Sequence, residues 1–154
     1  MHIVTASTKS AEELTNIAMS AKAYWGYSTE FMQDCAEELR VTKDKIQSDA
    51  FSYFVAETAQ QILGFYCLQK HGQDELELEA LFVKPEQMGR GVGKALFEHA
   101  MTEASKHQVT GIDIQSDPNA AAFYEAVGAT NIGYTQSGSI PGRSLPEYKM
   151  ELPL

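Results

Sequence analysis

Residues 81–94, which read LFVKPEQMGRGVGK, are the most informative part of the chain. An apolar strand pattern over residues 76–83 leads into alternating glycines, and an amphipathic helical pattern follows over about residues 91–107. Glycine lets the backbone turn sharply and approach a ligand closely. The first amides of a helix have no internal partner, and with the helix dipole they attract anions. The stretch therefore predicts a pyrophosphate site at a helix N-terminus, with Arg90 and Lys94 adding positive charge at its rim.

Two common nucleotide-binding motifs fit this loop poorly. A P-loop would have Gly at the position of Met88 and Ser or Thr at the position of Ala95. A dinucleotide fingerprint would have its last glycine at Lys94 or Leu96. Asp113 does lie about twenty residues beyond the loop, where such a fold places its acidic residue. A dinucleotide-binding protein therefore stays open as a less favoured alternative.

Hydrophobic periodicity predicts the elements around this loop. Apolar runs predict strands at residues 2–6, 51–57, 62–70, 76–83, 109–115, 132–136 and 147–152. Helical spacing predicts helices over residues 10–21, 28–39, 91–107 and 118–128. Short polar connections favour antiparallel neighbours, and a strand–helix–strand crossover follows them. We expect an α+β fold in one domain over residues 1–154, with a mixed, mostly antiparallel sheet of about seven strands flanked by about four helices.

The charge balance argues against nucleic acid as a partner. The chain has 12 Lys and Arg against 21 Asp and Glu, a formal net charge of −9. A field of that sign repels phosphate backbones. It would favour a cationic small molecule, although an acidic surface also serves solubility alone.

Other features predict a cytoplasmic protein without a membrane partner or a metal. The N-terminus has no basic and then apolar leader pattern, and no apolar run reaches the ~20 residues of a membrane span. Cys35 and Cys67 lie in apolar patterns without zinc-ligand spacing, so we expect buried thiols. The histidines are scattered, and no set of metal ligands is visible.

The glycine loop and a second motif downstream resemble the GNAT superfamily of N-acetyltransferases. Val83-Lys84-Pro85 followed by residues 88–93, MGRGVG, is similar to the acyl-CoA loop of that family. Met88 departs from the pattern, because the family usually has Gln or Arg there. Residues 119–129, NAAAFYEAVGA, resemble the family helix that opens with Asn, carries Tyr and ends at Gly. The resemblance is close over residues 50–136 and extends to the whole chain in the order of elements.

The resemblance implies transfer of an acetyl group from acetyl-CoA to the amine of a small molecule, by direct attack on the thioester. A backbone amide of Leu81, Phe82 or Val83 would stabilise the oxyanion. A homodimer would also be consistent with the family. The implied CoA contacts are Leu81, Phe82, Val83, Met88, Gly89, Arg90, Gly91, Val92, Gly93, Lys94, Asn119, Ala122 and Tyr124. A non-catalytic acyl-CoA-binding or regulatory module on the same fold is the alternative.

Acetyl transfer needs a base for the amine, whose ammonium has a pKa near 10, and an acid for the thiolate. Tyr124 matches the family tyrosine near the CoA sulfur and is the expected acid. Strand alternation places Glu75, Glu77 and Glu79 on one face, and Leu81 and Val83 continue that parity. We rank Glu79 first as the base and Glu77 second, acting directly or through water.

The expected acceptor side combines the first two helices with the polar loop at residues 137–146. Trp25 and Tyr27 could form its wall. Arg143 in the loop could hold an acceptor carboxylate through two hydrogen bonds, which would suit an amino acid. The acidic strand and the net charge favour a polyamine or another basic amine instead. The sequence leaves both acceptor classes open.

Overall fold

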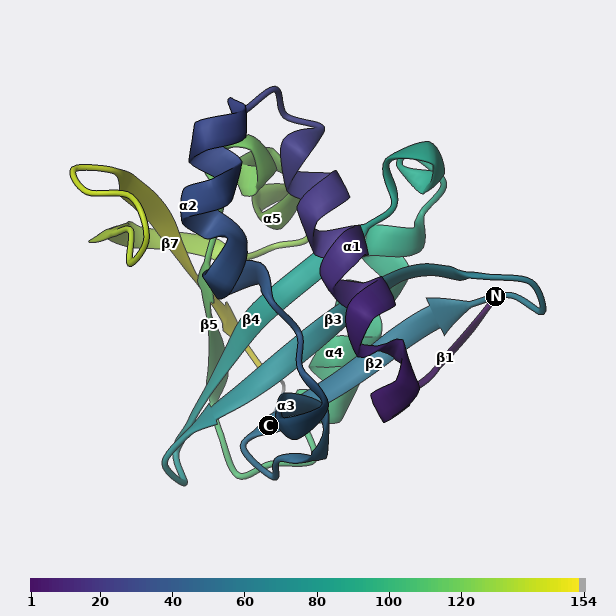
Figure 1. Cartoon of the computed structure of the whole chain (residues 1–154). Coiled ribbons are helices and arrows are strands. Elements are labelled where there is room, and N and C mark those ends of the chain that lie inside the picture. Colours follow the sequence, from purple (N-terminus) through teal and green to yellow (C-terminus); the bar gives the residue numbers. More distant parts are fainter. Residues whose placement is uncertain (153–154) are drawn as a thin grey trace.

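A computed structural model of the chain describes residues 1–152 and shows a seven-stranded sheet between two helical layers (Figure 1). The strands are β1 (His2–Thr5), β2 (Phe51–Glu57), β3 (Ile62–His71), β4 (Glu75–Val83), β5 (Gly111–Gln115), β6 (Thr130–Gln136) and β7 (Ser144–Glu151). The α-helices are α1 (Ala11–Ala23), α2 (Thr29–Leu39), α3 (Lys43–Gln47), α4 (Val92–Ala104) and α5 (Ala121–Ala126). Short 3-10 turns are η1 (Thr8–Ser10), η2 (Pro85–Gln87) and η3 (Pro118–Ala120).

The sheet has the order β1-β2-β3-β4-β5-β7-β6, and every neighbouring pair except β4 and β5 is antiparallel. The parallel pair is short: residues 76–78 of β4 face residues 112–114 of β5. Beyond Leu78, β4 continues for five more residues without a partner on that side. The sheet therefore splits at this point, and one edge of β4 is left open. The predicted α+β fold with a mixed, mostly antiparallel sheet is confirmed.

Each face of the sheet carries its own core. α1 and α2 cover one face and α4 the other, as Figure 1 shows. The core on the α4 side includes Leu76, Leu78, Leu96, Ile112 and Tyr148. The core on the α1–α2 side includes Leu14, Ile17, Cys35, Phe65 and Cys67. Cys35 and Cys67 are both free and buried, as the apolar patterns predicted.

A β-bulge at Glu79 changes which side chains of β4 face each layer. Cys67 of β3 pairs with Ala80, and Leu68 pairs with Leu78, so Glu79 is an extra residue. The sequence-based prediction that Leu81 and Val83 share the face of the glutamates is wrong. Both belong to the α4-side core, while Ala80 and Phe82 pack on the α1–α2 side. The bulge shifts the side-chain alternation by one residue, and strand periodicity alone does not reveal it.

The structure adds two local details to the predicted elements. α3 is a single short helix capped by Thr42, whose hydroxyl accepts from the Lys45 amide. Five residues are too few to show a helical stripe, so periodicity missed it. β7 begins at Ser144, before Pro146, and shortens the loop that the sequence predicted. Pro146 lacks an amide hydrogen, but its carbonyl accepts from the Ser116 amide, so β7 stays linked there to the residue that follows β5.

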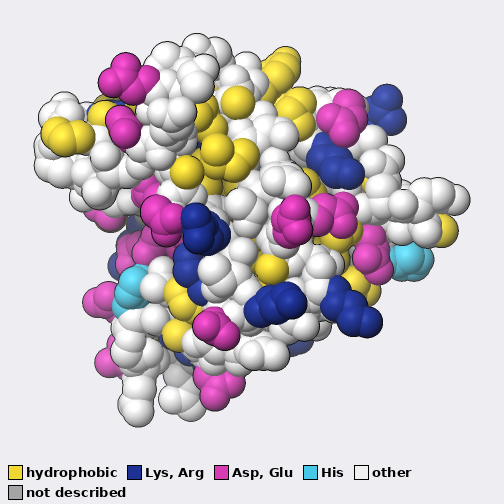
Figure 2. Space-filling view, viewed as in Figure 1, with side chains coloured by type: hydrophobic (Ala, Val, Ile, Leu, Met, Phe, Trp, Pro, Cys, Tyr) yellow, Lys and Arg dark blue, Asp and Glu magenta, His cyan; other side chains and the backbone are white. Residues whose placement is uncertain are grey.

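Surface charge is mixed on the face that α1 and α2 cover. Lys and Arg side chains lie among Asp and Glu side chains there, without a single large patch of one sign (Figure 2). No helix within residues 1–152 combines the length and the apolar character needed to cross a bilayer.

Candidate active site

One cavity of about 560 Å³ opens at the split between β4 and β5 and extends under α1 and α2. It brings together most of the side chains and backbone segments that the sequence singled out. These are Trp25, Glu77, Glu79, Leu81, Phe82, Val83, Met88, Gly89, Gly91, Gly93, Lys94, Asn119, Tyr124 and Arg143. Tyr27, Arg90, Val92 and Ala122 are not part of its lining. Val92 is instead buried in the α4-side core.

The glycine loop presents its backbone to one end of this cavity. Gly89 and Gly91 have φ values of +80° and +82°, a region that side chains with a Cβ rarely adopt. α4 follows directly, with Gly91 at its N-cap, no capping side chain and no acidic residue in its first turn. The amides of that turn are therefore free to hold an anion. Lys94 lies at the same end of the cavity, and Arg90 is exposed beside it.

Met88 has an apolar role at the position where the family pattern has Gln or Arg. Its side chain packs against the α4-side core and also lines the cavity. The polar side-chain contact of the family pattern is thus absent at this position. The loop therefore has its backbone amides, and no polar side chain at position 88, to offer an anion.

The open edge of β4 presents backbone amides toward the split. The Lys84 amide donates to the Leu63 carbonyl of β3 at 2.9 Å. Backbone groups alternate in direction along a strand, so the Phe82 amide also faces β3. The amides of Leu81 and Val83 face the open edge of β4, where β5 no longer pairs with it. Of the three amides that the sequence offered for an oxyanion, these two have the suitable direction.

Tyr124 lies on α5, lines the cavity and packs against other aromatic side chains. Its ring lies 5.2 Å from the Phe123 ring and 6.1 Å from the Tyr148 ring, between centroids. The side chain is 7% exposed, and burial raises the pKa of its hydroxyl above the ordinary value. The hydroxyl therefore keeps its proton at neutral pH and can act as a proton donor.

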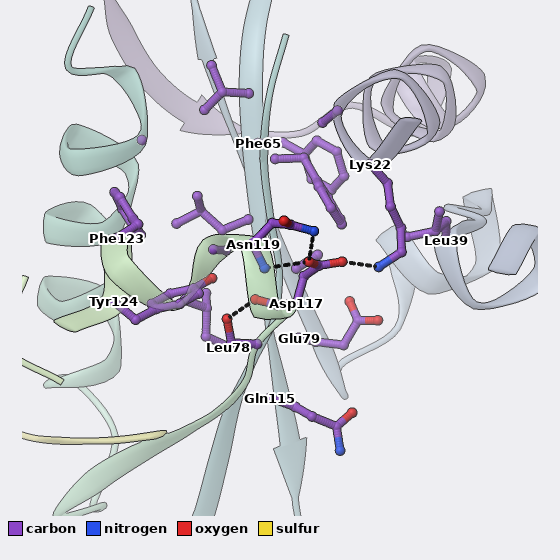
Figure 3. Close-up of a pocket in the computed structure, with 18 of the residues that line it drawn as sticks. Lys22, Leu39, Phe65, Leu78, Glu79, Gln115, Asp117, Asn119, Phe123 and Tyr124 are labelled. Atoms are coloured by element: carbon purple, nitrogen blue, oxygen red, sulfur yellow. Dashed lines mark hydrogen bonds and ion pairs between the residues drawn. The ribbon is translucent and has the colours of Figure 1, made fainter. Parts of the chain in front are cut away.

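Glu79 lies at the bulge, opposite Tyr124 in the close-up (Figure 3). Burial raises the pKa of its carboxyl, and the nearby Glu77 and Glu38 add to the effect, while Lys45 opposes it. Glu77 is held differently: its Oε1 lies 2.8 Å from His71 Nε2, and its side chain is 27% exposed. Of the two candidate bases, Glu79 therefore has the drier environment, and it is the one whose burial raises the pKa of the carboxyl.

A carboxylate that the sequence did not single out for the site, Asp117, lies at the other wall. Lys22 Nζ donates to its Oδ2 at 2.9 Å, and the Tyr27 hydroxyl donates to the same oxygen at 2.9 Å. The Asn119 amide donates to Oδ1 at 2.8 Å, and Arg143 Nη2 lies 3.3 Å from Oδ2. Figure 3 shows Lys22 reaching Asp117 from α1. The sequence pattern around Asp117 indicates only the start of a helix. No local pattern predicts hydrogen-bond partners from such distant segments.

Tyr27 completes this cluster rather than lining the cavity. Its hydroxyl accepts from Arg143 Nη2 at 2.6 Å and from Asn119 Nδ2 at 2.9 Å. Its ring stacks on Phe31 with centroids 4.1 Å apart, and the Arg143 guanidinium lies 5.2 Å from the Tyr27 centroid. Burial and the hydrogen bond to Asp117 raise the pKa of Tyr27 to about 12.

Comparison with known proteins agrees with this geometry. A family model described as an Acetyltransferase (GNAT) domain matches residues 5–141. The chain belongs to the GNAT acetyltransferase family. A relative of this GNAT protein, the 5-NmdU N-acetyltransferase of Pseudomonas phage PaMx11, is 32% identical over 113 residues, covering 67% of this chain and 81% of the relative.

Solved GNAT structures share the fold at low sequence identity. The PaiA N-acetyltransferase of Thermoplasma acidophilum, in complex with coenzyme A, has a TM-score of 0.80 at 20% identity, covering 97% of this chain and 98% of that one. The ribosomal-protein-S18-alanine N-acetyltransferase of Escherichia coli has a TM-score of 0.72 at 20% identity, covering 99% and 94%. The fold predicted from the two motifs is therefore that of the family.

Proposed function

We propose that this GNAT protein transfers an acetyl group from acetyl-CoA to the amine of a small molecule, by direct attack on the thioester. One observation carries the proposal: the uncapped N-terminus of α4, the open edge of β4, Tyr124 and Glu79 all border one cavity. An anion site, an oxyanion donor, an acid and a base are the groups that acetyl transfer needs. No other function considered for the chain uses all four.

The residues fit acetyl-CoA as co-substrate. The free amides after Gly89 and Gly91, with Lys94 beside them, suit its pyrophosphate. The open edge of β4 and Asn119 suit the pantetheine arm. Bound acetyl-CoA supplies an activated acyl carbonyl at the split of the sheet.

Each catalytic role then belongs to a named group. Glu79 accepts a proton from the incoming ammonium, directly or through water, so that the neutral amine attacks the acyl carbon. The amide of Leu81 or Val83 donates to the acyl oxygen as negative charge develops there. Tyr124 donates its proton to the departing sulfur. Glu77 is the second candidate for the base, and no metal has a role.

The acceptor is proposed from the cavity and from relatives. The phage relative is named for 5-NmdU and the Escherichia coli structure for the alanine of a ribosomal protein, so acceptors differ within the family. The volume of the cavity under α1 and α2, about 560 Å³, and the presence of Trp25 in its lining support a small amine rather than a folded protein. The cytoplasmic location and the homodimer stay predictions.

An amine panel that follows release of free thiol from acetyl-CoA tests the proposal. The panel should hold diamines, polyamines, amino acids, aminoglycosides and 5-NmdU. Thermal shift with acetyl-CoA, CoA and NADH runs beside it, because a ligand that binds only the folded state raises Tm. Stabilisation by CoA without thiol release would favour a non-catalytic module. Stabilisation by NADH alone would favour a dinucleotide-binding protein.

Gly91→Ala should weaken acetyl-CoA binding by about tenfold or more, a loss of about 1.4 kcal/mol. A Cβ at φ +82° strains the N-cap of α4 and disturbs the amides that face the anion. Isothermal titration with acetyl-CoA measures the affinity. Gly72→Ala is the matched control, because Gly72 has φ +75° in the β3–β4 hairpin and equally open surroundings. A similar loss of affinity in both variants would mean that the loop has no specific role.

A further inference from the structure

The cluster around Asp117 has the features of a receptor for a carboxylate. Its donors come from α1, from the turn before α2, from η3 and from the β6–β7 loop, and Lys22 lies 95 residues away in sequence. Both carboxylate oxygens are hydrogen-bonded, one of them to a lysine. Burial alone would raise the pKa of Asp117, but the hydrogen bonds from Lys22, Asn119 and Tyr27 outweigh it and lower the pKa to about 2. The carboxylate is therefore charged at every physiological pH.

Two cations of the cavity wall, Lys22 and Arg143, are paired with this carboxylate, which balances one of their two positive charges. The side chains of Lys22, Asp117 and Arg143 are only 14%, 13% and 16% exposed, and all three line the cavity. Without Asp117, the planar guanidinium of Arg143 could form two hydrogen bonds with an acceptor carboxylate, and the ammonium of Lys22 could add an ionic contact. With Asp117 present, that position is already filled by an equivalent group of the protein.

Besides this cluster, the charged side chains of residues 1–152 that line this side of the cavity are three carboxylates, those of Glu38, Glu77 and Glu79, and one cation, Arg40. Burial is the largest cause of the raised pKa of Glu79, and Glu38 is close enough for its charge to raise that pKa further. Ser139 Oγ donates to Glu38 Oε2 at 2.7 Å and keeps that carboxylate beside the β6–β7 loop. An acceptor with its own carboxylate would therefore meet Asp117 in its binding position and like charges nearby.

We propose that Asp117 is a specificity-determining residue, an internal carboxylate that occupies the Lys22–Arg143 site and thereby excludes acceptors with a carboxylate near their amine. The acceptor class is then a basic or neutral amine. This inference rests on the proposed function and deepens it. The inference also decides between the two acceptor classes that the sequence left open. Arg143 was expected to bind the carboxylate of an acceptor, but it already contacts the carboxylate of Asp117.

The first test measures binding alone and needs no turnover. Asp117→Ala removes the carboxylate and leaves a space that matches formate. We expect formate to raise the Tm of Asp117→Ala by about 3 °C or more at ten times its Kd, and to leave wild-type Tm unchanged. Formamide, which has the same shape without the charge, should not reproduce the shift, and chloride controls for ionic strength. An equal response of both proteins to formate would overturn the proposal.

The second test uses pairs of acceptors that differ only by a carboxylate, such as cadaverine with lysine and agmatine with arginine. Wild type should favour the amine without the carboxylate by at least tenfold in kcat/KM. Asp117→Ser keeps an oxygen that can accept from the Asn119 amide but vacates the Lys22–Arg143 site, so it should reduce that preference by tenfold or more, through a lower KM for the carboxylate-bearing partner. Asp117→Glu, which keeps the charge, should retain the preference. A preference that is unchanged in Asp117→Ser, or wild-type preference for lysine or arginine, would contradict the proposal.

The two tests separate this inference from the proposed function. If wild type binds acetyl-CoA but acetylates no amine, the proposed function fails, while the formate experiment still decides whether the cluster receives a carboxylate. If Asp117→Ala folds only with formate, that dependence supports the proposal. If it folds in neither condition, the thermal shift of Asp117→Ser with lysine and with cadaverine takes its place, and stabilisation by lysine alone is the expected result.

Discussion

Tyr124→Phe should lower kcat by about 10²-fold, because it removes the only atom that distinguishes the two side chains, the proton-donating hydroxyl. Burial raises the pKa of this hydroxyl, so it is fully protonated in the working range of pH. Phenylalanine keeps the ring contacts with Phe123 and Tyr148. We therefore expect KM for acetyl-CoA and the Tm to change little. Steady-state kinetics by thiol release, with the pH dependence of kcat, measure the effect.

Tyr148→Phe is the matched control for this variant. Tyr148 is also buried and lies beside Tyr124, but it is not part of the cavity lining. Its hydroxyl donates to Glu125 Oε2 at 2.7 Å. Loss of the Tyr148 hydroxyl should affect the Tm more than it affects kcat. Equal losses of kcat in the two variants would assign Tyr124 to packing, and an unchanged kcat in Tyr124→Phe would remove it from the mechanism.

Glu79→Gln should lower kcat/KM by about 10²- to 10⁴-fold, since glutamine cannot accept the ammonium proton. Burial raises the pKa of Glu79, so wild-type kcat/KM should fall on the acid side at a pH above the ordinary range of a glutamate. The variant should lose that limb of the profile. The measurement is kcat/KM against pH for one amine at saturating acetyl-CoA.

The same substitution should make the protein more stable at neutral pH. When a carboxyl has a raised pKa in the folded state, the folded state holds more protons than the unfolded state between the two pKa values. Stability therefore falls as pH rises through that window, and at pH 7 the burial of the Glu79 carboxyl lowers the free energy of unfolding. Glu79→Gln should show a higher Tm at pH 7 than wild type, and a smaller difference at pH 4.

Glu77→Gln provides the comparison for both measurements. Glu77 pairs with His71 and is more exposed, so we expect a smaller loss of kcat/KM and no gain in Tm. If Glu77→Gln loses more activity than Glu79→Gln, the order of the two candidate bases is reversed. If neither variant changes the pH profile, the amine enters neutral or water removes its proton.

The motifs that predicted the family depend on local conformation, which explains why the sequence alone was enough to recognise them. Alternating glycines ahead of an amphipathic helix predict an exposed helix N-terminus, because both the turn and the free amides arise within a few residues. Gly89 and Gly91 have the positive φ values that this pattern implies. Strand and helix periods are equally local, so the order of the major elements and the two-sided sheet followed from them.

Features that depend on pairing between distant segments lay beyond the sequence. The bulge at Glu79 exists because β3 and β4 change register between Cys67 and Leu68, and alternation in β4 alone predicted the wrong face for Leu81 and Val83. The split after Leu78 likewise depends on where β5 stops pairing. Both features position the groups proposed for acyl transfer.

The sequence by itself determined the fold class, the anion-binding loop and the presence of Tyr124 and Glu79, because each is encoded in a continuous stretch. Only the tertiary structure decided what surrounds them. It buried Glu79 and Tyr124, which shifts their pKa values, and it brought Lys22, Tyr27 and Arg143 to Asp117 from segments up to 95 residues away. Burial and long-range charge pairing are properties of the packed chain, so the expected class of acceptor could be argued only after the cavity was assembled.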